Sequence, residues 1–156
     1  MTKASRSGKQ TRPANLEVLE MGKAYFLIVD DDALVTRSYM RIVGRYFLEC
    51  GRSIETIVVH SGPEAIKSVE LILAIEPEAE WGLLTDYDMP LMTGAVLIDR
   101  LDERLGTKLI WRLVLTGALD DARKAEIEAK QAFVDEKPVH KKDLESYLYT
   151  FITSLA

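Results

Sequence analysis

Cysteine and long apolar runs are scarce in this sequence, and both shortages narrow the class of protein. The single cysteine, Cys50, excludes an intramolecular disulfide and a cysteine-based metal cage. No apolar run approaches the roughly 20 residues that a membrane-spanning helix needs. The polar, basic segment 1–10 lacks the apolar core of a secretory signal. We therefore expect a cytoplasmic protein with no membrane span.

Positive charge is also scarce beyond the N-terminus. Residues 1–23 hold five lysines and arginines against two glutamates, a balance of +3, so the rest of a chain with net charge −5 carries −8. Direct DNA binding is not expected of so acidic a body, because phosphate backbones are bound by clustered Lys and Arg. We interpret 1–23 as a basic, disordered arm with a short helix near 16–21, and 24–156 as one domain.

Short apolar runs alternate with helical patterns along the domain, which predicts a parallel α/β sheet. The expected strands are 24–29, 55–59, 81–85, 109–115 and 131–136, and the expected helices are 32–47, 61–73, 94–105, 120–130 and 141–155. In the first helix the predicted buried stripe is Val35, Tyr39, Ile42 and Tyr46. Ser61 and Gly106 are candidate helix caps. The fourth helix is short and polar, so we expect it to be weakly anchored.

Polar residues follow four of these strands directly. They are Asp30-Asp31-Asp32, Asp86-Tyr87-Asp88-Met89-Pro90, Thr116-Gly117 and Lys137-Pro138. The carboxyl ends of parallel strands share one edge, where ligands bind. Carboxylates, a hydroxyl and an ammonium converging there could hold a divalent cation and a phosphoryl group together.

The residue types suggest a division of roles for phosphoryl transfer to an aspartate. Asp86, after a central strand, is the expected nucleophile. Asp31 would bind Mg²⁺ directly, Asp30 through water, and Asp88 through its backbone carbonyl. Thr116 and Lys137 would contact the phosphoryl oxygens.

These motifs, together with Gly94 eight residues after Asp86, resemble the receiver domain of CheY-like two-component response regulators. The resemblance covers about residues 24–155. It implies a flavodoxin-like, doubly wound sheet of five strands in the order 2-1-3-4-5 with five helices. It also implies Mg²⁺-dependent phosphorylation of Asp86 by a sensor histidine kinase or a histidine phosphotransfer protein. In this family the Lys137-Pro138 peptide would be cis. Since the last helix reaches the chain end, we expect a stand-alone receiver that signals by altered binding to an unidentified protein target, without a separate enzymatic domain.

One position departs from the family pattern. Receivers commonly carry Tyr or Phe three residues before the lysine, as the aromatic that turns inward on phosphorylation. Here that position is Val134, and Phe133 precedes it. A bulge in the last strand would restore Phe133 to the role; without one, the aromatic part of the switch is absent.

Several residues have plainer interpretations, and two other functions stay open. Trp81 and Trp111 are expected to pack in the core, and Asp32 to begin a helix. His60, within a strand, and His140, at a helix start, are expected to be structural or solvated. The alternatives are an unphosphorylated pseudo-receiver that binds proteins, and an aspartate-nucleophile phosphatase of the haloacid dehalogenase type, whose Asp-x-Asp motif Asp86-Tyr87-Asp88 echoes.

Overall fold

The computed structural model describes residues 22–156, so the expectations for the arm before Gly22 lie outside the described residues. The strands are β1 (Ala24–Val29), β2 (Ile54–Val59), β3 (Glu80–Asp86), β4 (Leu109–Thr116) and β5 (Phe133–Glu136). The helices are α2 (Ala33–Glu49), α3 (Gly62–Leu73), α4 (Gly94–Leu105), α5 (Asp121–Glu128) and α6 (Lys141–Ser154), with a 3-10 turn η1 (Gly106–Lys108). Among these residues no helix is long and apolar enough to cross a membrane.

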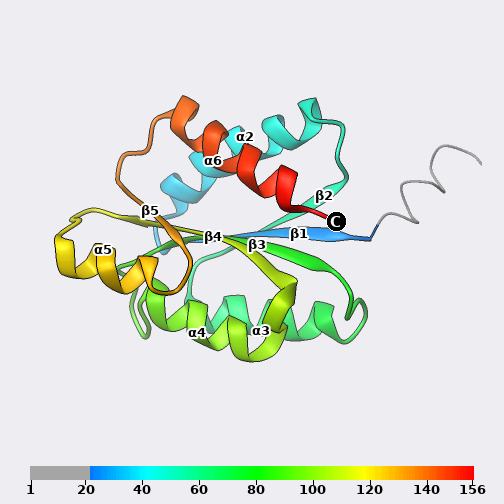
Figure 1. Ribbon diagram of the computed structural model, residues 1–156, viewed down its shortest axis with the longest axis horizontal. Coiled ribbons are helices and arrows are strands. Elements are labelled where there is room, and N and C mark those ends of the chain that lie inside the picture. Colours follow the sequence, from blue (N-terminus) through cyan, green and yellow to red (C-terminus); the bar gives the residue numbers. More distant parts are fainter. Residues whose placement is uncertain (1–21) are drawn as a thin grey trace, which may run out of the picture.

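The strands form one parallel sheet in the order β2-β1-β3-β4-β5, which confirms the expected flavodoxin-like topology. Helices α2 and α6 cover one face, and α3, α4 and α5 lie on the other (Figure 1). The interior strand β1 is buried along its whole length, as expected of a strand covered on both sides.

The two faces of the sheet are filled differently. Under α2 and α6 lies a cluster rich in aromatic rings, in which Phe26 and Trp111 both contact Phe151. Under α3 and α4 the packing is mainly aliphatic, with Trp81 stacked on Tyr25. Both tryptophans are therefore core residues, as predicted.

Most helix boundaries follow from their caps. Asp32, Ser61 and Asp120 each accept a backbone N–H in the first turn of the following helix, and Gly106 ends α4 with φ of 53°. Asp32 thus begins a helix, as expected. The last predicted strand starts two residues late, at Phe133, because Gln131 adopts a left-handed turn with φ of 58°.

The buried stripe of α2 differs from the prediction. The fully buried residues are Thr36, Tyr39, Val43 and Phe47. Val35, Ile42 and Tyr46 are only partly buried beside the same cluster. The reason is that α2 packs on the sheet and on α6 at once, so its apolar surface is wider than a single stripe.

Two glycines offer a matched test of this packing. A Cβ at Gly82 would lie 2.8 Å from the Phe151 ring and 2.9 Å from the Phe26 ring, whereas a Cβ at Gly44 meets nothing within 4 Å. We expect Gly82→Ala to lower the free energy of unfolding by about 1–3 kcal/mol through overpacking. Gly44→Ala, inside α2, should raise it by roughly 0.5–1 kcal/mol. Urea denaturation measures both, and a Gly82→Ala protein as stable as Gly44→Ala would contradict this account of the core.

Candidate functional site

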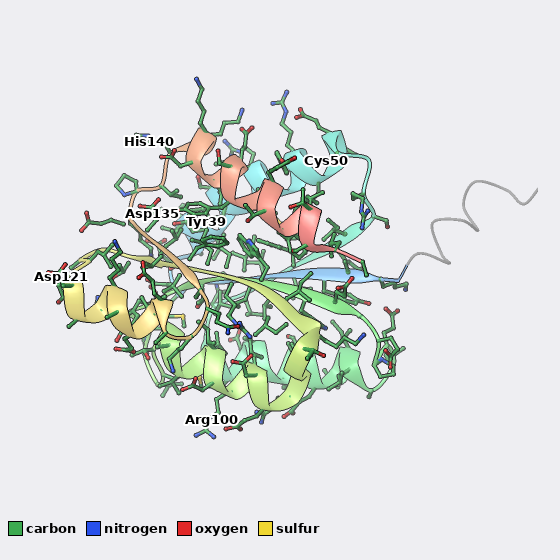
Figure 2. All side chains as sticks on the ribbon, viewed as in Figure 1. Tyr39, Cys50, Arg100, Asp121, Asp135 and His140 are labelled. Carbon is green, nitrogen blue, oxygen red and sulfur yellow. The ribbon has the colours of Figure 1, made fainter. Side chains whose placement is uncertain are left out.

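The predicted polar residues do meet at the carboxyl edge of the sheet. Asp30 follows β1, Asp86 and Thr116 end β3 and β4, and Lys137 follows β5. Adjacent strands bring them together because their registers run to the strand ends, with Asp86 opposite Leu115 and Thr116 opposite Glu136. Figure 2 marks this end of the molecule by Asp121, Asp135 and His140, which lie there together.

Three carboxylates form the acidic part of the site. One oxygen from each of Asp30, Asp31 and Asp86 lies within 4.8 Å of the others. Asp30 and Asp86 are buried, whereas Asp31 is exposed. An all-oxygen set of this kind suits a hard divalent cation such as Mg²⁺, with water filling the remaining positions. The residues present therefore fit the expected metal, while the roles of Asp30 through water and of the Asp88 carbonyl stay predictions.

Lys137 supplies the positive charge of the site. Its Nζ lies 2.7 Å from Asp30 Oδ2 and 3.1 Å from Asp86 Oδ1. Burial alone would lower the pKa of this ammonium, but its hydrogen bonds to Asp30 and Asp86 outweigh burial and raise the pKa above 10.5. Lys137 is thus held in its charged form. The following Lys137–Pro138 peptide is cis, as expected.

Burial has the largest effect on the pKa of the Asp86 carboxyl. It raises the pKa of Asp86 above the ordinary 3.8, and the contact with Lys137 offsets only part of this effect. The pKa of Lys137 rises because two carboxylates stabilise its charged form. The pKa of Asp86 rises because burial and two acidic neighbours outweigh its one ammonium partner. A buried, partly neutralised carboxylate with acidic neighbours favours the arrival of a cation.

Gly94 is required by the close approach of the backbone of Asp86. Its N–H donates to the Tyr87 carbonyl at 2.9 Å, and a Cβ here would collide with the backbone oxygen of Asp86. The spacing of eight residues from Asp86 therefore has a steric cause. Any larger residue would push the helix α4 away from the acceptor.

Thr116 is fully buried, and its hydroxyl already has partners. It donates to the Ala118 carbonyl at 3.2 Å and accepts a hydrogen bond from Arg123 Nη1 at 2.8 Å. Arg123 also lies 3.0 Å from Asp88 Oδ2. The sequence analysis did not single out Arg123, because no motif or spacing connects an arginine in the first turn of α5 to this site.

Two more residues near the site were missed or misplaced. His60 does not lie within a strand; it follows β2, where its Nδ1 is 3.1 Å from the Asp30 carbonyl oxygen. The strand ends at Val59 because the chain turns there into the cap of α3. Tyr39 lies between α2 and the sheet (Figure 2), and its burial raises its pKa to about 12.

The structure also decides between Phe133 and Val134. The ladder between β4 and β5 runs without a shift from Leu113–Phe133 to Thr116–Glu136, so the proposed bulge is wrong for this segment. Phe133 contacts the rings of Trp111 and Tyr147, on the α6 side. Val134 packs against the opposite cluster, which contains Val114 and Ile127 of α5. The position that faces α5 thus carries no aromatic ring.

A first prediction concerns the metal. With Mg²⁺ at about ten times its Kd, binding to the folded state should add about 1.4 kcal/mol and raise the melting temperature. Asp31→Ala should remove this rise in melting temperature, because it deletes one of the three carboxylates that would bind the cation. Asp31 is the exposed member of the three. In metal-free buffer the same variant should be at least as stable as wild type, because one repulsive charge is lost.

The control is Glu49→Gln, at the far end of α2, which also removes one exposed charge. It should keep the magnesium-dependent rise in a thermal melt. An Asp31→Ala protein that keeps the full rise would mean that the cation binds elsewhere.

A second prediction concerns pH. A carboxyl whose pKa is raised on folding stabilises the folded state fully below its unfolded pKa, and this contribution is lost as the pH rises through the folded value. Replacing Asp86 by Asn removes that dependence. In urea denaturation with EDTA, Asp86→Asn should therefore gain stability over wild type as the pH rises from about 4 to 7. A stability difference that stays constant across this range would show that burial does not govern Asp86.

No family model and no curated protein matches the sequence. Solved structures do match. The chemotaxis response regulator CheY4 of Vibrio cholerae is 26% identical with a TM-score of 0.57, over 85% of this chain and 99% of that one. A two-component response regulator from Cytophaga hutchinsonii is 22% identical with a TM-score of 0.67, over 85% and 98% of the two chains.

A further match is the signal receiver domain of a DNA binding response regulator from Colwellia psychrerythraea. It is 20% identical, with a TM-score of 0.66, over 84% of this chain and 99% of that domain. The three matches span nearly the whole of each neighbour. Sheet order, helix placement and structural neighbours agree, and the chain has the fold of a CheY-like response regulator receiver domain.

Proposed function

We propose that this protein is a phosphorylatable response regulator receiver whose acceptor is Asp86. The observation that carries the proposal is the position of that carboxylate. It is buried, lies 3.1 Å from the Lys137 ammonium, and shares a cluster of oxygens with Asp30 and Asp31. Among the described carboxylates, only Asp30 and Asp86 contact Lys137, and Asp30 is already bound by the Asp32 N–H.

The chemistry follows from these contacts. An Asp86 carboxylate oxygen attacks the phosphorus of a phosphohistidine on a sensor kinase or a phosphotransfer protein. A P–O bond forms, the P–N bond breaks, and the leaving imidazole takes up a proton. Bound Mg²⁺ would neutralise phosphoryl charge. Lys137 is placed to contact one phosphoryl oxygen, and a rotation of Thr116 would let its hydroxyl donate to another. The side chains of this domain thus promote its own phosphorylation.

Specific observations weigh against the phosphatase alternative. Enzymes of that class carry the motif after their first strand. Here the Asp88 side chain is exposed and bound to Arg123, and the motif follows β3, not β1. The pseudo-receiver alternative predicts the same fold, and phosphorylation itself decides it.

The proposed output is a change in protein binding at the surface made by α5, β5 and α6. Thr116 and Lys137 begin the segments that lead into α5 and α6, and only Ile127 of α5 is buried. A helix held so lightly can change position at a small cost in free energy. Phosphorylation would then bias partner binding by population shift.

The test of this function is direct phosphorylation. After incubation with acetyl phosphate and Mg²⁺, wild-type protein should gain the mass of one phosphoryl group, seen by intact mass spectrometry and reversed by hydroxylamine. Asp86→Asn should gain none, because no other described carboxylate combines a free oxygen, the ammonium and the acidic cluster.

Asp135→Asn is the matched control, because Asp135 also lies near the end of a strand but is hydrogen-bonded to Tyr147. It should be labelled like wild type. Labelling of Asp86→Asn at the wild-type level would overturn the assignment, and an unlabelled wild type would favour the pseudo-receiver.

A further inference from the structure

Arg123 links α5 to both loops beside the acceptor. Its Nη1 donates to Thr116 Oγ1 at 2.8 Å, to Asp88 Oδ2 at 3.0 Å and to the Ala118 carbonyl at 3.2 Å. One group on the helix therefore bonds the residue that ends β4 and the loop that follows β3. A movement of either loop changes the environment of the same guanidinium group.

Tyr87, the neighbour of the acceptor, completes this link. The guanidinium carbon of Arg123 lies 3.9 Å from the centre of the Tyr87 ring, a distance at which a cation and an aromatic face attract each other. The Tyr87 hydroxyl donates to Glu126, one turn further along α5, with both carboxylate oxygens at 3.2 Å. The residue after Asp86 thus contacts α5 at two successive turns.

Few buried side chains anchor this helix, although just beyond its C-terminal end Lys130 contacts Asp99 at 2.7 Å and its carbonyl accepts from Arg112. Within α5 only Ile127 is buried, and the Lys124–Glu128 ion pair at 4.0 Å joins residues of the same helix. Arg123 is 24% exposed as a side chain, so its contacts are partly shielded from water. The contacts of Arg123 and Tyr87 therefore carry a large part of the attachment of α5.

The hydroxyl of Thr116 has one hydrogen to give. In this structure that hydrogen is directed to Ala118, while Arg123 occupies a lone pair of the oxygen. A phosphoryl oxygen on Asp86 can only accept, so Thr116 must turn its hydrogen away from Ala118 to bind it. That rotation also turns the lone pairs of the oxygen, so the lone pair that accepts from Arg123 no longer points at Nη1.

We propose that Arg123 is the positioning residue that couples the acceptor site to α5. It would serve the coupling role that an aromatic ring has in other receivers, because this chain has Val134 at the position of that ring. The inference rests on the proposed function. In the unphosphorylated protein Arg123 holds Thr116 and Asp88 and fastens α5. When Thr116 turns to a phosphoryl oxygen, Arg123 loses its shortest contact and α5 is released.

Amide hydrogen exchange of peptides covering 119–130, with intact mass to measure site occupancy, tests the coupling. In unphosphorylated protein, Arg123→Ala should exchange on the order of tenfold faster than wild type along α5, because bonds to a charged group are lost. Lys124→Ala, the next residue on the same helix, should exchange like wild type. Arg123→Lys keeps the charge but not the forked donor geometry, and should restore only part of the protection.

Phosphorylation supplies the readout that a merely structural arginine would not change. Wild type and Lys124→Ala should exchange faster in α5 once Asp86 is phosphorylated. Arg123→Ala should reach the same occupancy and show no further increase. A full exchange response in Arg123→Ala overturns the coupling.

Two other outcomes also contradict the inference, and intact mass spectrometry distinguishes them by the phosphoryl group that each protein carries. If Arg123→Ala loses its phosphoryl group much faster than wild type but keeps the α5 response, Arg123 is a phosphoryl ligand and not a coupling residue. If wild type takes up no phosphoryl group, the proposed function fails, and the coupling fails with it before any exchange is compared.

Discussion

The contact of one ammonium with two buried carboxylates is the interaction on which the site depends. Lys137 lies 107 residues from Asp30 in the chain, yet the Nζ–Oδ2 distance is 2.7 Å. Two buried carboxylates this close would repel each other, and burial would penalise both charges. The ammonium offsets part of the repulsion between the two carboxylates. Its contacts also join the ends of β1, β3 and β5. A site held in this way places one ammonium beside a buried carboxylate and leaves an excess of negative charge, which a divalent cation would neutralise.

The two faces of the sheet differ in how firmly their helices are packed. Aromatic side chains from β1, β4, α2 and α6 interlock on one face, and Trp111 Nε1 donates to Thr150 of α6 at 2.8 Å. On the other face α3 and α4 are well packed, but α5 is anchored by one buried residue and a set of polar contacts. Local opening requires least free energy where few apolar contacts are lost. The weakest helix of the described fold is therefore the one that reaches the acceptor site directly.

Strand positions and helix caps were predictable because they depend on neighbours in sequence. The apolar run before Asp30 and the caps Asp32 and Ser61 are local signals, and the structure confirms them. The burial of α2 was predicted less well, since a helix packed on a sheet and on α6 buries more than one stripe. The strand assignment of His60 failed by a single residue, at the point where backbone pairing gives way to a helix cap.

Reading the chain alone was enough to predict that the acidic, hydroxyl and ammonium groups gather at one edge of the sheet. Parallel strands always place their carboxyl ends together, so a residue's position after its strand is enough. The face that Phe133 occupies and the residue that contacts Thr116 became known from the folded chain. The face depends on the register of β5, and a one-residue slip would have reversed it. Arg123 reaches Asp88 across 35 residues through a helix placed by packing, and no spacing in the sequence specifies such a contact.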